Sequence, residues 1–70
     1  MIEVKAELVA NVWKVLVELG QFVGEGDVLV IVESMKMEIP IEAPVQGRIE
    51  ALNVAEGDVV QEGDVIAEIE

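Results

Sequence analysis

Few side chains in this sequence are suited to covalent chemistry. The chain has no histidine, cysteine, threonine or tyrosine, and its single serine is Ser34. A nucleophile that is activated within its own protein needs a neighbouring base, which is usually histidine. The fifteen aspartates and glutamates are spread along the chain and form no calcium loop of the Asp-x-Asp-x-Asp-Gly type. We therefore expect neither an independent enzyme nor a metal site, and an enzyme that relies on carboxylates is the weakest alternative.

One lysine stands out by its neighbours. Lys36 lies between Met35 and Met37, and methionine is a flexible apolar residue that is common at binding surfaces. A solvated lysine is a poor nucleophile by itself, but an enzyme that deprotonates it and presents an activated acid can form an amide on it. Most single lysines are ordinary surface residues. Lys5 and Lys14 lack flanking methionines, and we expect both to remain unmodified.

The chain contains one internal repeat with an offset of 37 residues, as between Gly20 and Gly57. Residues 6–33 match residues 43–70, most clearly where Glu-Gly-Asp-Val of residues 25–28 recurs at residues 62–65. Two copies are too few for a solenoid, so the two halves are expected to share one core with quasi-twofold symmetry. The unmatched centre, residues 34–42, would then join the halves as a hairpin with its tip near Met35-Lys36-Met37.

Glycines divide the apolar runs into short segments typical of an all-β fold. Gly-Asp and Glu-Gly-Asp are turn signals, and the segments between them are rich in valine and isoleucine, which favour strands. Strands are expected at Ile2–Leu8, Asn11–Leu19, Val28–Glu33, Met37–Glu42, Arg48–Val54 and Asp64–Ile69, with short pieces at Phe22–Val23 and Val59–Val60. This pattern predicts a sandwich or flattened barrel.

Two of these segments share an irregular apolar spacing. Val12, Val15, Leu16 and Leu19 have the spacing of a helix, but the run is short, rich in valine and ended by glycine. Its repeat keeps the same step of three and then two residues, at Ile49, Leu52 and Val54. We therefore interpret both segments as strands that contain a β-bulge.

Length and charge limit the remaining classes of protein. Seventy residues with 53% hydrophobic content predict one domain, residues 1–70, held by packing alone. A net charge of −11 disfavours nucleic-acid and anionic-membrane partners. We see neither a signal peptide nor an apolar run of membrane-spanning length, and expect a cytoplasmic location.

The segment around Lys36 resembles the biotinylation motif of biotin carboxyl carrier domains, whose core is Met-Lys-Met preceded by alanine or serine. The motif here reads Glu-Ser-Met-Lys-Met-Glu at residues 33–38. Residues 43–49 are similar to the family's Ala-Pro-x-x-Gly-x-Val element, and residues 56–66 to its C-terminal turns and strands. Residues 6–12 lack the usual proline and glycine. The chain is most similar to single-domain biotin/lipoyl attachment proteins.

The resemblance implies a structure and a role. The fold would be a barrel-sandwich hybrid of two four-stranded antiparallel sheets, with Lys36 on an exposed hairpin and both termini at the opposite end. A biotin–protein ligase would attach biotin to Lys36. The biotin would then carry carboxyl groups between the biotin carboxylase and carboxyltransferase sites of an acyl-CoA carboxylase, such as acetyl-CoA carboxylase. The chain itself would be a non-catalytic carrier, monomeric on its own.

The resemblance also implies roles for the residues that flank Lys36. Met35 and Met37 would help the ligase to choose the site and would tune transfer, and Ser34 belongs to the same cofactor-binding motif. Glu33 and Glu38 would meet basic side chains of the ligase or carboxylase, although solvation at a strand edge explains them equally well.

Two other functions remain open on the sequence. A lipoyl carrier would share the fold, with lipoate in place of biotin, but its lysine usually lies in Asp-Lys-Ala. An unmodified interaction module would tolerate replacement of Lys36.

Overall fold

The computed structural model describes residues 1–70 as eight strands without a helix. The strands are β1 (Ile2–Lys5), β2 (Ala10–Val15), β3 (Phe22–Val23), β4 (Val28–Ser34), β5 (Met37–Glu42), β6 (Gly47–Leu52), β7 (Val59–Val60) and β8 (Val65–Ile69). Buried and exposed residues alternate along β2 and β6, the pattern of an antiparallel sheet with one face covered. None of the chain forms a helix with the length and apolarity needed to cross a bilayer.

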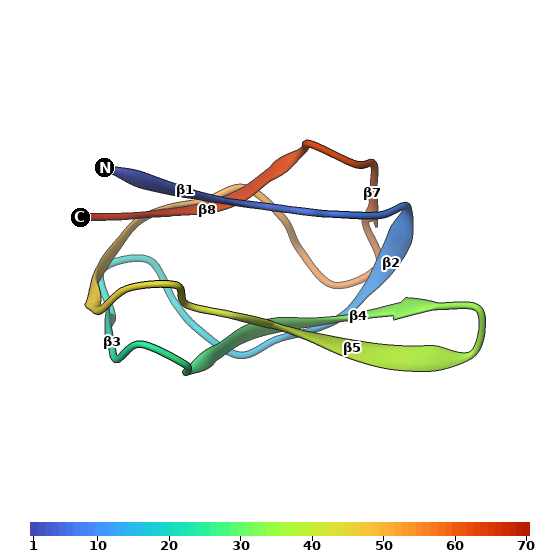
Figure 1. Cartoon of the computed structure of the whole chain (residues 1–70), viewed down its shortest axis with the longest axis horizontal. Coiled ribbons are helices and arrows are strands. Elements are labelled where there is room, and N and C mark those ends of the chain that lie inside the picture. The colour runs from blue at the N-terminus through green and yellow to red at the C-terminus, as the bar shows by residue number, and fades with distance from the viewer.

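The strands form two four-stranded antiparallel sheets, as expected. Their orders are β1-β8-β6-β3 and β5-β4-β2-β7, so each sheet combines strands from both halves of the chain. Figure 1 shows β1 and β8 side by side in one layer and β4 and β5 in the other. Because neither half can build a sheet without the other, the two halves form one interlocked structure.

The sequence repeat is a quasi-twofold symmetry of the structure. An offset of 37 residues maps β2 onto β6 and β3 onto β7, and it converts the order β1-β8-β6-β3 into β5-β4-β2-β7. The predicted bulges are present at equivalent places, between Val12 and Lys14 in β2 and between Ile49 and Ala51 in β6. Both the symmetry and the bulges are therefore confirmed.

The repeated Glu-Gly-Asp-Val forms a turn in which the aspartate side chain accepts a backbone hydrogen bond from the residue three positions earlier. Gly26 has a φ of 90°, which a residue with a Cβ rarely adopts, and its N–H donates to the carbonyl of Ala43 at 2.9 Å. The Asp27 carboxylate accepts a hydrogen bond from the Gly24 N–H at 2.8 Å. In the second copy Gly63 also has a φ of 90°, its N–H donates to the carbonyl of Ala6 at 2.8 Å, and the Asp64 carboxylate accepts a hydrogen bond from the Gln61 N–H at 2.8 Å. The same four residues also occur at residues 56–59, where Gly57 has a φ of 95° and the Asp58 carboxylate accepts a hydrogen bond from the Ala55 N–H at 2.8 Å, so all three turns use the glycine and the aspartate in the same way.

The core lies between the two sheets and contains only apolar side chains. Fifteen buried hydrophobic residues form one cluster, and no polar or charged side chain is buried. Leu29, Ile49 and Ile66 are fully buried, and Ile39 packs against the cluster. Val32, buried in β4, is paired with Ile39 in β5. The core thus holds the β4–β5 hairpin up to this pair, beyond which only two further pairs precede the turn.

Three expected strands were predicted too long at their C-terminal ends. They end at Lys5, Val15 and Leu52, instead of Leu8, Leu19 and Val54. The apolar pattern continues past these ends because the chain there crosses between the sheets and still buries Val17. A buried residue in a crossover produces the same sequence signal as a buried residue in a strand.

Candidate functional site

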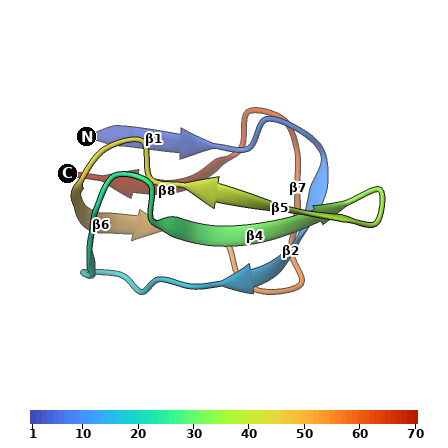
Figure 2. The same ribbon diagram turned by 60° about the horizontal axis from the view of Figure 1, so that its bottom comes forward.

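Lys36 lies at the tip of the β4–β5 hairpin. The strands pair as far as Ser34 and Met37, which leaves a two-residue turn formed by Met35 and Lys36. Figures 1 and 2 show this hairpin extending beyond the rest of the molecule, at the end opposite both termini. The predicted hairpin tip and the predicted position of the termini are both confirmed.

The turn has an unusual backbone for its residue types. Met35 and Lys36 have φ values of 53° and 64°, as a type I′ turn requires. Asparagine and glycine normally occupy such turns, and other L-residues pay roughly 1–2 kcal/mol each for the left-handed conformation. No glycine or asparagine marked this backbone in the sequence. The conformational preference of the turn therefore does not explain why methionine and lysine occupy these two positions.

The side chains of the turn extend into solvent. Met35 is 91% exposed and Met37 is 65% exposed. Lys36 is exposed, and no hydrogen bond or ion pair engages its side chain. The tip thus presents a free primary amine between two thioethers, which is the group needed to form an amide with a carboxylic acid.

Two carboxylates lie on the stem just below the tip. Glu33 and Glu38 are opposite each other in the β4–β5 register, and both are exposed. Like charges in directly opposite positions destabilise a sheet. Ser34, which is half-buried, pairs with Met37. The structure therefore gathers all six residues of the motif, 33–38, on one hairpin end.

The two other lysines have different surroundings. Lys5 lies in β1, where its Nζ is 3.6 Å from Glu3 Oε1. Lys14 lies in β2, with its Nζ 5.4 Å from the centroid of the Trp13 ring. Lys5 and Lys14 each lie on a strand, beside a carboxylate and an aromatic ring respectively, whereas Lys36 lies on a turn and has no such contact.

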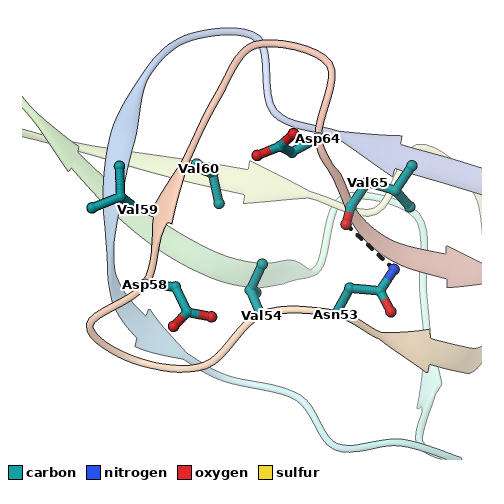
Figure 3. Close-up of a pocket in the computed structure, with 7 residues that line it drawn as sticks. All are labelled: Asn53, Val54, Asp58, Val59, Val60, Asp64 and Val65. Carbon is teal, nitrogen blue, oxygen red and sulfur yellow. Dashed lines mark hydrogen bonds between the residues drawn. The ribbon is translucent and has the colours of Figure 1, made fainter.

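A hollow beside β7 and the start of β8 is lined by none of the motif residues 33–38 (Figure 3). The Asp58 carboxylate accepts a hydrogen bond from the Ala55 N–H, and the Asp64 carboxylate accepts one from the Gln61 N–H, both at 2.8 Å. Asn53 also lines the hollow, and its side chain donates to the carbonyl of Val65 at 3.3 Å. No cluster of three or more potential metal ligands is present in the chain. The polar groups of this hollow serve its turns and form no second site.

The sequence is similar to a known protein family and to two well-covered relatives. Residues 3–69 match the family model described as "Biotin-requiring enzyme". The chain is 54% identical over 67 residues to a biotinylated protein TB7.3 homolog of Mycobacterium leprae, covering 96% of this chain and 94% of the relative. It is 44% identical over 66 residues to a biotin/lipoyl attachment protein of Bacillus subtilis, covering 94% of this chain and 90% of the relative.

A solved structure shares the fold. Kluyveromyces lactis urea carboxylase matches with a TM-score of 0.91 and 30% identity over 99% of this chain, which corresponds to 6% of that much longer enzyme. The match to the family model covers nearly the whole chain, and the two relatives are matched over most of their own length. This chain belongs to the biotin/lipoyl attachment domain family.

Proposed function

We propose that Lys36 is biotinylated and that the chain serves as the biotin carboxyl carrier of an acyl-CoA carboxylase. The observation that carries this proposal is the free amine of Lys36, held on a left-handed turn between two exposed methionines. Neither packing nor turn preference explains these residues, whereas recognition by a modifying enzyme explains both. The names of the relatives, which include a biotinylated protein and a carboxylase, support the same cofactor.

The attachment step uses one atom of this chain. A biotin–protein ligase would supply biotinyl-adenylate, and the Nζ of Lys36 would attack its acyl carbon. The new C–N bond forms as the C–O bond to the phosphate breaks, AMP leaves, and the Nζ proton passes to a base of the ligase. The chain contributes an amine that is free of hydrogen bonds and ion pairs, so no interaction has to be broken first.

After attachment the chain positions its cofactor. Bound biotin supplies a ureido nitrogen that accepts and releases a carboxyl group. The lysyl-valeryl arm has about 10 bonds and a reach of roughly 12–14 Å, and the protruding hairpin moves its origin away from the body of the domain. Tethering raises the local concentration of the cofactor at each active site within reach. The partners in this role are the ligase, a biotin carboxylase and a carboxyltransferase.

Lipoate is the second candidate cofactor. The name of the Bacillus subtilis relative includes both biotin and lipoyl, and lipoate would form the same kind of amide with Lys36. The methionines on both sides of the lysine favour biotin, because lipoyl lysines usually follow an aspartate.

Separate incubation with each of the two modifying enzymes tests the proposal. Purified protein is incubated with ATP and either biotin and a biotin–protein ligase or lipoate and a lipoate ligase, and its intact mass is measured. We expect one biotinyl increment that is absent from Lys36→Arg, because arginine retains the charge but cannot form this amide. Exclusive lipoylation, or no modification of the folded protein, would refute the biotin proposal.

A further inference from the structure

A row made of three apolar side chains and one lysine crosses the outer face of the sheet that carries the hairpin. The register places Lys14, Ile31 and Pro40 side by side on β2, β4 and β5. Trp13, the extra residue of the β2 bulge, lies next to Lys14 and is 43% exposed. We name these four residues the Trp13 face. The outward row nearer the tip contains Glu33 and Glu38, so the face is continuous with the lysine hairpin.

The quasi-twofold symmetry allows this face to be compared with the equivalent row on the other sheet. The equivalent row on the other sheet places Ala51, Glu68 and Glu3 side by side, with Glu50 in the β6 bulge. Three positions that carry tryptophan, isoleucine and proline on the Trp13 face thus carry glutamate on the equivalent face. Because both faces have the same backbone pattern, the fold itself does not require apolar residues at these positions.

We infer that the Trp13 face is a docking surface for the biotin–protein ligase, an inference that rests on the proposed function. Before modification, the Nζ of Lys36 reaches only about 6 Å from its Cα. The ligase must therefore contact the hairpin directly and cover part of its stem. A carboxylase active site, in contrast, receives a biotin that extends more than twice as far.

The chemistry of the face defines its partner surface. Tryptophan is enriched among residues that dominate binding energy, and an interface of about 800 Å² on each partner is wide enough to include both Trp13 and the tip. Ile31 lies three residues before Ser34, which corresponds to about 10 Å along the strand. The ligase should present an apolar contact to Trp13 and basic side chains to Glu33 and Glu38, because these two carboxylates repel each other when no cation lies between them.

The test is the steady-state kinetics of biotinylation with the full chain as substrate. Trp13→Glu installs the residue that the equivalent position, Glu50, already carries. We expect the KM for the unmodified protein to rise about tenfold or more with kcat nearly unchanged, since the lysine is untouched. Trp13→Phe should restore most of the affinity, and Trp13→Ala gives a second variant without added charge.

The matched control is Gln46→Glu. It adds the same charge at an exposed position in the loop before β6, where the next two residues, Gly47 and Arg48, lie against the C-terminal Glu70, and it should leave the KM unchanged. Thermal unfolding of each variant checks that the domain is folded.

Three outcomes separate this inference from the proposed function. A wild-type KM for folded Trp13→Glu and Trp13→Ala overturns the docking surface while leaving Lys36 as the attachment site. Normal biotinylation of Trp13→Glu with slower carboxyl transfer from the loaded variant overturns it as well, and assigns the face to a carboxylase. Failure of wild-type protein to accept biotin defeats the proposed function and this inference with it.

Discussion

Lys36 combines a free amine with a backbone conformation that residues with a Cβ seldom adopt. The strain is maintained because the stem of the hairpin is paired up to Ser34 and Met37 and is held at its base by the core. Strained backbone often persists at functional positions because the surrounding structure enforces it. The proposed attachment at Lys36 thus comes with a cost in stability at the same residue.

Replacing Lys36 with glycine should therefore make the protein more stable. Glycine adopts the φ of 64° at this position without a steric penalty, and we expect the free energy of unfolding to rise by about 1 kcal/mol. Lys36→Ala is the control, because it removes the same charge but retains a Cβ. Urea unfolding would measure both, and a gain from alanine equal to that from glycine would show that backbone strain is not the cause.

At the scale of elements, the two halves differ where β6 meets the end of β8. A Cβ added to Gly47 would lie 2.5 Å from the carbonyl oxygen of Glu70 and 2.7 Å from Ile69 Cγ2. The equivalent residue in β2 is Ala10, which is buried with its Cβ present. The close approach at Gly47 is therefore specific to the second half, where Arg48 and Glu70 exchange backbone hydrogen bonds of 2.9 and 3.0 Å.

Gly47→Ala should consequently destabilise the domain. The new Cβ meets backbone and a buried side chain, which leave it little room, and we expect a loss of about 2–3 kcal/mol in the free energy of unfolding. Gly24→Ala is the matched control, since its Cβ would contact only the exposed Asp27 carboxylate at 3.6 Å and should cost less than about 1 kcal/mol. Equal losses in the two variants, measured by urea or heat, would contradict this explanation.

The sequence predicted most of these elements and the location of Lys36, because the repeat fixed which segments are equivalent and left one unmatched centre. It could not predict where the strands end, since Val17 is buried in a crossover and extends the apolar pattern. The sequence also could not predict the positive φ of Met35, because methionine does not favour that conformation. The Trp13 face depends on register between distant strands, which a single sequence does not reveal.

The whole molecule has a hairpin end, which carries Lys36, and an opposite end, which carries the termini. Under the quasi-twofold, Glu33 corresponds to Glu70 and Glu38 corresponds to Met1, so the hairpin tip is equivalent to the gap between the chain ends. Ile2 pairs with Ile69, which holds those ends together. The lysine can thus approach an enzyme while the termini lie on the far side of the domain (Figure 2).

This equivalence predicts that the domain tolerates circular permutation. Glu70 would be joined to Met1 by a linker as long as residues 34–37, and new termini would be placed between Met35 and Lys36. Exposed turns with nearby chain ends are favourable places for such changes. We expect the permuted chain to retain its β-sheet circular dichroism spectrum and one cooperative unfolding transition, and a chain without a cooperative transition would contradict the equivalence.

The most direct test of the central claim is to locate the modification. The full chain is taken to completion with a biotin–protein ligase, biotin and ATP, digested, and sequenced by tandem mass spectrometry. We predict that biotin is found on Lys36 alone, because its amine is the one held free on a turn between methionines. Stoichiometric biotin on Lys5 or Lys14, with Lys36 unmodified, would contradict the account.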